Sequence, residues 1–249
     1  MIKRVKIIIE YDGTGYVGWQ NQRNGKSVQG EIENALLELF DKKIKLSGAG
    51  RTDSGVHAAG QVAHFDFDEK FTNLDKTCKS INYILSKNNN RISILKVSYE
   101  TDNFHSRFSA RKKKYVYKIL NRPTKSYLYE NRAWFIPTKL DLKKMIKASS
   151  FFVGKFDFNA FRSTHCQALQ SVRSIEKIII KRSKETIHLN FSGKSFLHNQ
   201  IRIMVGTLVD VGRGKIEVDK VKEILESRDR TKAGVTAPPH GLYLEKIIY

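Results

Sequence analysis

The chain has 249 residues, enough to bury a large core as one domain or as two domains of about 100 to 130 residues. Its hydrophobic content of 40% excludes a disordered chain, and no apolar run approaches the roughly 18 residues of a membrane-spanning helix. Forty-five Lys and Arg residues against 25 Asp and Glu residues give a net charge of +20, which favours a polyanionic partner, most commonly a nucleic acid.

A membrane surface and a codon bias are the alternatives to a nucleic acid as the origin of the charge. An anionic membrane surface would require a basic amphipathic helix or a lipidation site, and the sequence has neither. A codon bias toward Lys would account for part of the excess, but not for the shortage of acids. The apolar segment Val5–Ile9 is too short for a signal peptide, and Cys78 and Cys166 form no disulfide framework, so a cytoplasmic protein is expected.

Periodicity predicts alternating strands and helices in the first half of the chain. The clearest is a helix in which Val28, Ile32 and Leu36 recur at helical spacing, with Ser27 as its N-cap. The expected elements are a strand at 4–10, a helix at 28–41, a strand at 60–67, a helix at 74–86 and a strand at 91–99.

The polar, basic segment 101–115 is predicted to cross into a second half. The elements expected there are strands at 114–120 and 132–136, a helix at 140–150, a hairpin of 171–181 with 185–192, helices at 197–210 and 218–226, and a strand at 242–248. This order predicts an α+β protein, with one domain at residues 1–103 and another at 104–249, rather than a parallel βαβ run.

A glycine-rich bend, GAGRTDSGVHAAGQVAHF at 48–65, contains the first candidate for chemistry, Asp53. Glycines allow backbone angles closed to other residues, so the bend can approach a ligand closely. The cation of Arg51, two positions earlier, favours the charged form of Asp53, which suits a nucleophile or charge stabiliser. The simpler interpretation is that Asp53 caps a turn and Arg51 is a solvated charge.

Three further segments combine aromatic, basic or glycine residues. YDGTGYVGWQ at 11–20 suits stacking against bases, or a turn that packs its aromatics on the core, and it matches neither a Rossmann fingerprint nor a P-loop. The segment 104–120 carries five cations before an expected strand in which Tyr115 and Tyr117 share a face, so it is either a phosphate and stacking site or a solvated face. Those cations are Arg107, Arg111, Lys112, Lys113 and Lys114.

The expected helix at 197–210 places Arg202 on a well-packed element. One stripe is apolar, and His198, Arg202 and Gly206 fall on a neighbouring face at i, i+4 and i+8. An arginine that is fixed on a packed helix could be held against a carboxylate. The alternative is an arginine that lies at an interface or in solvent. The seven histidines are scattered, and the adjacent His165 and Cys166 do not give zinc-ligand spacing, so no metal is predicted.

Six segments in this order resemble the tRNA pseudouridine synthase A family. They are YDGTGYVGWQ (11–20), SVQ (27–29), GRTDSGVHA (50–58), FHSRFSARKKKYVY (104–117), FLHNQIRIMVGTL (196–208) and APPHGLYL (237–244). The resemblance spans essentially the whole chain. Three positions depart from the family pattern: Ser54 and Ser106 stand where alanine is frequent, and Tyr16 stands where phenylalanine is common.

The resemblance implies that uridine in RNA is converted to pseudouridine without a metal or organic cofactor. Asp53 would be the nucleophile, attacking either the ribose or the base, and Arg202 would pair with Asp53. Tyr115 would stack on the target uracil and take part in removing the proton from carbon 5. Arg51 would assist entry of the flipped nucleotide or fill the place that it leaves in the stack. The further substrate-binding residues expected on this basis are His57, Arg107, Arg111 and Lys114.

The family's substrate is the anticodon stem-loop of tRNA, at positions 38 to 40, where a flexible loop lowers the free energy needed for base flipping. Its fold has two similar α+β halves with largely antiparallel sheets that meet along a central basic cleft, and the family works as a homodimer. Two alternatives stay open: a synthase of the same fold that acts on other tRNA or ribosomal RNA sites, and a non-catalytic RNA-binding module.

Overall fold

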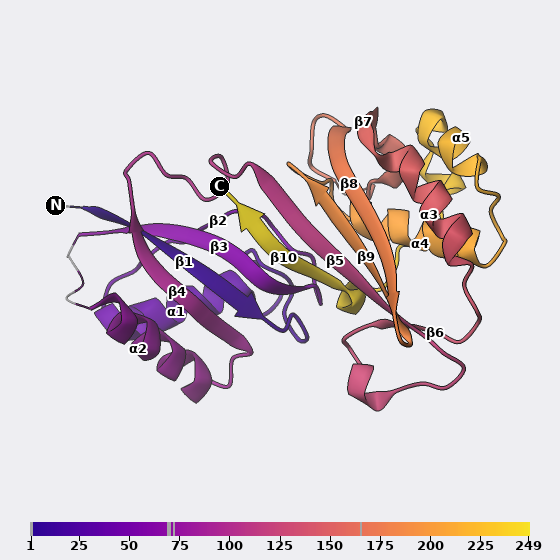
Figure 1. The fold of residues 1–249 in the computed structure, drawn as a ribbon. Helices are drawn as coiled ribbons and strands as arrows, with labels where there is room; N and C mark the ends of the chain where they lie inside the picture. Colours follow the sequence, from indigo (N-terminus) through magenta and orange to yellow (C-terminus); the bar gives the residue numbers. More distant parts are fainter. Residues whose placement is uncertain (1, 69–70, 72, 165) are drawn as a thin grey trace. The chain divides into compact units, whose positions relative to one another are not determined.

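The computed structural model describes residues 2–68, 71, 73–164 and 166–249, and the chain divides into two compact units (Figure 1). The first unit comprises Met1–Arg111 and Leu244–Tyr249, and the second comprises Lys112–Tyr243. Each unit combines a mostly antiparallel sheet with helices, so the predicted α+β class with two mixed halves is confirmed. The basic cleft at which the halves would meet stays a prediction.

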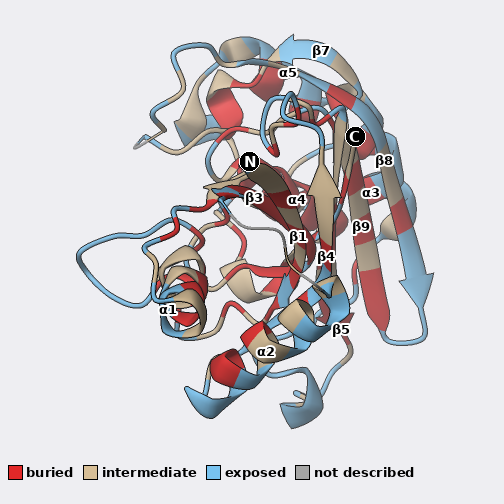
Figure 2. Ribbon diagram, turned by 90° about the vertical axis from the view of Figure 1, so that its left-hand side faces the viewer, coloured by how far each residue is buried: buried red, intermediate tan, exposed pale blue. Residues whose placement is uncertain are grey.

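The first unit is a sheet with two helices. Its elements are β1 (Lys3–Tyr11), α1 (Val28–Phe40), β2 (Ser47–Gly48), β3 (His57–Phe67), α2 (Leu74–Lys87) and β4 (Ile92–Glu100), and β10 (Leu242–Ile248) lies beside β3. β1 pairs antiparallel with both β3 and β4, with Ile7 opposite Ala63 and Val97. Alternate residues of β1 are buried, as the period of two in a half-buried strand requires. α1 and α2 pack on each other, and each shows buried and exposed stretches (Figure 2).

The second unit has the strand order β5–β9–β8–β7, with β6 parallel to β5. Its strands are β5 (Lys112–Asn121), β6 (Trp134–Ile136), β7 (Gly154–Asp157), β8 (Val172–Ser183) and β9 (Thr186–Gly193). Its helices are α3 (Leu142–Ser149), α4 (Gln200–Gly212) and α5 (Lys220–Ser227). α4 is buried almost all round and not along one stripe, because α3 packs against it and the loop before β10 also covers it.

All the predicted strands and helices form within a few residues of their expected bounds, and Ser27 caps α1 by accepting a hydrogen bond from the Gly30 amide at 3.0 Å. The sequence did not predict the short strands β2 and β7 or the 3₁₀ turns. One expected start is wrong: α4 begins at Gln200, because Asn199 takes a left-handed φ of +61°. His198 therefore precedes the helix and does not share a helical face with Arg202.

The division between the units falls after Arg111, later than the predicted boundary between 103 and 104. The segment in between is bound to the first sheet. The hydroxyl of Ser106 donates to the Ser47 carbonyl at 2.6 Å, and the Arg111 amide donates to the Ile248 carbonyl at 2.8 Å. The basic segment crosses to the second unit only after these contacts.

Candidate active site

Two loops of the first unit form the surroundings of Asp53. The glycine loop (residues 12–27) connects β1 to α1, and the aspartate loop (residues 49–56) connects β2 to β3. Asp53 is half-buried and stands directly before the turn at residues 54–55, and Arg51 is exposed on the same loop. The structure therefore places the predicted nucleophile and the predicted entry residue on one loop, directly before the first residue of β3.

Glycines allow the two loops to touch through their backbones. A Cβ atom at Gly18 would lie 2.6 Å from the Thr52 carbonyl oxygen, and one at Gly13 would lie 2.1 Å from the Val56 carbonyl oxygen. Real Cβ atoms do not approach oxygen so closely, and Gly18 also has a φ of +115°, which other residues rarely adopt. The glycines of the first motif are thus required by the second motif, on either side of Asp53.

Hydrogen bonds fix the residue that precedes Asp53. The hydroxyls of Tyr11 and Thr52 lie 2.7 Å apart, and the Trp19 amide donates to the Thr52 carbonyl at 3.1 Å. Tyr11 is 3% exposed, and burial raises the pKa of its hydroxyl far above the usual value, so the group is neutral. Two aromatic residues of the glycine loop and its entry strand thereby hold Thr52 through both its side chain and its backbone.

The rest of the aspartate loop is held in the same way. The Gln61 side-chain amide donates to the Gly50 carbonyl at 2.9 Å, and the Ser54 hydroxyl donates to the Tyr16 carbonyl at 3.0 Å. Asp53 consequently stands on a segment that is anchored before, beside and after it. A carboxylate held this way loses little conformational freedom when it meets a substrate.

His57, predicted to contact substrate, lies in the interior and is 1% exposed. Its Nδ1 atom accepts a hydrogen bond from the Gly13 amide at 3.0 Å and lies 3.1 Å from a carboxylate oxygen of Asp12. Asp12 in turn accepts from Thr14 and pairs with Arg91 at 3.0 Å. The structure thus gives His57 a buried place that supports the glycine loop, and its predicted contact with substrate stays a prediction.

The second unit holds Arg202 in the first turn of α4. Its Nε atom donates to the Ala237 carbonyl at 2.7 Å, its Nη1 atom donates to Asn199 Oδ1 at 2.7 Å, and its own carbonyl accepts from the Ala237 amide at 3.1 Å. Ala237 is fully buried. The guanidinium is half-buried, and its direction is fixed by the peptide of the APPHGLYL motif.

Tyr115 lies on β5 opposite Phe191 and is 8% exposed. Its ring meets Phe196 edge-on, with centroids 5.4 Å apart and planes at 82°. Two residues along, Tyr117 is fully buried and donates to the Pro238 carbonyl at 2.8 Å. The second unit therefore orients an aromatic ring and a cation on rigid elements.

Several of these supporting residues were not among the predicted site residues. Tyr11 and Gln61 anchor the aspartate loop, and Asn199 and Ala237 anchor Arg202. Tyr11, Asn199 and Ala237 lie within the six segments and Gln61 lies in the bend at 48–65, but nothing else in the sequence marks them, because each acts only through a hydrogen bond to another residue of the fold.

The remaining predicted RNA-contacting cations come after β4 in the sequence. Arg107 and Arg111 are exposed, and Lys114 is half-buried on β5. The neighbouring Lys112 forms an ion pair with Glu176 at 2.5 Å. Exposed arginines fit both a solvated face and a phosphate-binding face.

The three departures from the family pattern each add a hydroxyl that finds a partner. Tyr16 donates to Asn90 Oδ1 at 3.1 Å, Ser54 to the Tyr16 carbonyl, and Ser106 to the Ser47 carbonyl. They strengthen the loops without replacing a residue expected to act in chemistry.

Among the described residues, no group of three or more His, Cys, Asp or Glu side chains could hold a metal ion, and no helix is long and apolar enough to cross a membrane. His165, considered with Cys166 as a metal-binding pair, lies outside the described residues.

The α+β fold, the carboxylate fixed between two loops and the strongly basic chain together fit the class of enzymes that act on nucleic acids. The model of one family, described as tRNA pseudouridine synthase, matches residues 7–109 and 148–249. Because this match and the relatives below cover most of the chain, the protein belongs to the tRNA pseudouridine synthase family.

Relatives named tRNA pseudouridine synthase A are similar over their whole length. The protein of Allorhizobium ampelinum is 46% identical over 246 residues, which is 99% of this chain and 95% of the relative. Those of Anaplasma phagocytophilum and Ehrlichia canis are each 44% identical, over 99% of this chain and 100% of their own lengths. A solved structure titled "Crystal Structure of a Cbf5-Nop10-Gar1 Complex" is 9% identical with a TM-score of 0.35, over 96% of this chain and 57% of that chain, too distant to support an inference.

Proposed function

We propose that this enzyme isomerises uridine to pseudouridine in tRNA, within the anticodon stem-loop at positions 38 to 40. The observation that carries the proposal is the aspartate loop, where Asp53 of the GRTDSGVHA segment is held by backbone and side-chain contacts on both sides. Family membership over nearly the whole chain supports the same reaction.

Asp53 acts as the nucleophile that lets the uracil detach. The bond between N1 of the base and C1′ of the ribose breaks, the base turns over, and a bond from C5 to C1′ forms. The hydrogen of C5 leaves as a proton and N1 takes up a proton, so the product is an isomer of the substrate and no co-reactant is required. The carboxylate attacks either the ribose or the base, and in both routes its bond to the substrate breaks again before the product leaves.

The other proposed roles follow from where each side chain is held. Arg202, locked by Ala237 and Asn199, pairs with Asp53 in the working enzyme and stabilises its charge. Tyr115, ordered on β5, stacks on the target uracil and takes part in removing the C5 proton. Arg51, exposed on the aspartate loop, assists entry of the flipped nucleotide.

The charge of +20 supports a substrate that is bound through its phosphates. We further propose that Arg107, Arg111 and Lys114 bind RNA, that the enzyme works as a homodimer, and that it acts in the cytoplasm. Sedimentation of the purified protein tests the dimer.

Tritium release from a tRNA transcript labelled at C5 of uridine tests the reaction, since pseudouridine formation must expel that hydrogen. Asp53→Asn is expected to abolish release and to leave tRNA binding nearly intact, because the amide keeps the shape of the carboxylate. Asp102→Asn, at an exposed carboxylate of the same unit, is the matched control and should keep full activity.

Release by the wild type and by the control, but not by Asp53→Asn, establishes the reaction and its carboxylate. Appreciable release by Asp53→Asn would refute the nucleophile. Tight tRNA binding by the wild type without any tritium release would favour a non-catalytic RNA-binding module. Tritium release from ribosomal RNA alone would favour a pseudouridine synthase that acts on ribosomal RNA sites.

A further inference from the structure

Phe108 is an apolar side chain held in solvent by a rigid turn. It is 74% exposed, although it stands only two residues after the fully buried Ser106. The turn is closed by a pair of bonds: the His105 amide donates to Ser109 Oγ at 2.9 Å, and the Ser109 amide donates to the His105 carbonyl at 2.9 Å. The Arg107 amide adds a bond to His105 Nδ1 at 3.1 Å.

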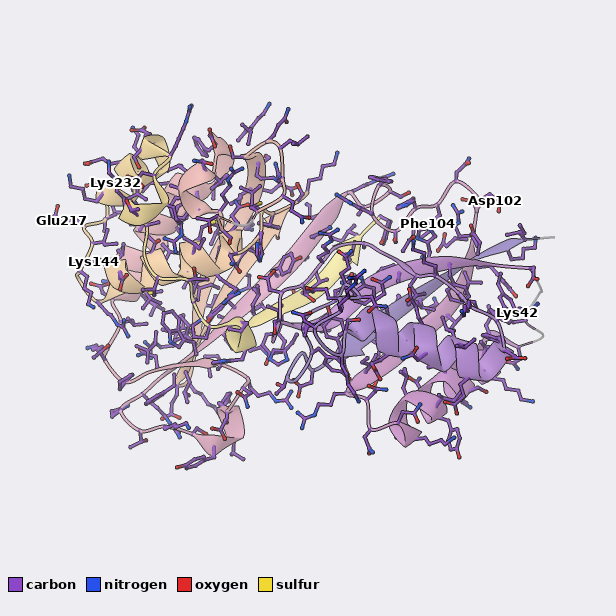
Figure 3. All side chains as sticks on the ribbon, turned by 180° about the vertical axis from the view of Figure 1, so that it is seen from behind. Lys42, Asp102, Phe104, Lys144, Glu217 and Lys232 are labelled. Carbon is purple, nitrogen blue, oxygen red and sulfur yellow. The ribbon has the colours of Figure 1, made fainter. Side chains whose placement is uncertain are left out.

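The turn is also anchored to the first sheet. The Ser106 side chain reaches both the Ser47 carbonyl at 2.6 Å and His64 Nδ1 at 2.9 Å, and the Tyr249 hydroxyl donates to the Ser106 carbonyl at 2.8 Å. Phe104, labelled in Figure 3, lies at the start of the same segment and is buried. Its ring centroid lies 4.9 Å from that of Tyr249. Exposure of Phe108 is therefore built into the turn and is not a result of a loose loop.

Phe108 has aromatic and cationic neighbours. Its ring centroid lies 4.4 Å from that of His105, with planes at 37°, and the Arg107 guanidinium lies 5.6 Å from it. Arg107 is itself exposed, as is Arg111 four residues further on. An exposed ring beside arginines is the arrangement by which proteins bind unpaired nucleic acid bases, with stacking on the ring and phosphates at the cations.

The charge around the turn favours a polyanion over a second copy of the chain. The sequence has no Asp or Glu between Asp102 and Glu130, while five cations stand at 107 and 111–114. Of the nearby carboxylates, Asp66 is bound by both Arg4 Nε and Nη2 at 2.7 and 2.8 Å, and Glu100 pairs with Lys6. A second copy would bring a like-charged turn, whereas RNA supplies both bases to stack and phosphates to pair.

We propose that Phe108, with His105 and Arg107, is a stacking site for an unpaired base of the RNA substrate. The inference rests on the proposed function in one respect, that the substrate is RNA. This contact lies on the first unit and involves a base other than the target uridine. It contributes to the affinity for RNA and not to the chemical step.

Phe108→Leu keeps the apolar volume but loses the aromatic face, and Phe108→Trp keeps that face. Loss of one stacked base corresponds to about 5- to 150-fold in affinity. Phe108→Leu is therefore expected to raise KM for tRNA and the directly measured tRNA Kd by that factor with kcat unchanged, and Phe108→Trp to stay near wild type. Tyr83→Leu, which alters a tyrosine of the same unit that is 72% exposed, is the matched control and should leave KM unchanged.

An unchanged tRNA Kd in Phe108→Leu would overturn the proposal, and so would an equal rise in Tyr83→Leu. A variant that sediments as a smaller species than the wild type would also overturn it, because the turn would then be an interface between copies. If wild-type enzyme releases no tritium but Phe108→Leu still weakens tRNA binding, the stacking site stands and the proposed reaction fails.

Discussion

Removing one hydroxyl, in Tyr11→Phe, tests whether Asp53 is positioned through its neighbour Thr52. The hydroxyls of Tyr11 and Thr52 are 2.7 Å apart, with side chains that are 3% and 7% exposed. The substitution leaves Thr52 without this buried partner, which costs about 1–3 kcal/mol. For a chain of this size, each kcal/mol lowers Tm by about 2–4 °C, so the variant should stay folded at assay temperature.

The effect on catalysis should be larger than the effect on binding. A displacement of about 1 Å at a catalytic group can reduce turnover about 100-fold, and we expect Tyr11→Phe to lower kcat by about 10- to 100-fold with KM within about twofold. Tritium release at saturating tRNA measures this. Tyr16→Phe is the matched control: it removes a hydroxyl from the glycine loop that bonds Asn90 and not the aspartate loop, and it should keep kcat.

Wild-type kcat in Tyr11→Phe would refute the positioning argument, as would an equal loss in Tyr16→Phe. A double-mutant cycle with Thr52→Val gives an independent check. If the two residues act as one contact, the double variant should be no worse than either single variant, whereas additive losses would mean that each side chain acts separately.

Gly18→Ala should reduce kcat more than 100-fold, because its Cβ atom would lie 2.6 Å from the Thr52 carbonyl oxygen. Gly15→Ala, whose Cβ atom would have no neighbour within 4 Å, should lower stability alone. Equal kcat values in the two variants would contradict this reasoning. Asn199→Ala removes a 2.7 Å bond to Arg202 and should lower kcat about tenfold with tRNA Kd unchanged, and a change in Kd alone would argue against the role. Burial lowers the pKa of three histidines, so the unfolded chain takes up protons first and stability should fall as pH drops below about 6.5. These are His64, His188 and His240. Denaturant unfolding at pH 7.5, 6 and 5 measures the effect, and a free energy of unfolding that stayed constant or rose as the pH was lowered would contradict the reasoning.

The secondary structure was predictable because hydrophobic periodicity records which side of each element is buried. The helix at 28–40 and the strand at 3–11 follow this rule closely. β2 and β7 have only two and four residues, too few to show a period. The start of α4 depends on a left-handed Asn199, which hydrophobicity does not encode.

The candidate site was predictable as a set of segments and not as a structure. Asp53 and Arg202 were recognisable through the segments that contain them, since each side chain alone also fitted a turn cap or a solvent arginine, and the bond from Arg202 to Ala237 joins residues 35 positions apart. For His57 the sequence could not tell a side chain that contacts substrate from one that supports the fold. Its burial, at 1% exposure, is visible only in the structure.

The supports of the candidate catalytic residues combine peptide groups and side chains. The carbonyls of Gly50 and Thr52 anchor the loop of Asp53 and that of Ala237 holds Arg202, while side-chain bonds between Tyr11 and Thr52 and between Asn199 and Arg202 complete the supports. Substitutions that disturb these supports should therefore reduce kcat and leave affinity. The ring of Phe108 and the cations beside it are exposed to solvent instead, and substitutions there should reduce affinity and leave kcat. A variant of Phe108 that lowers kcat at saturating tRNA, or a variant of Tyr11 that acts only on KM, would break this separation.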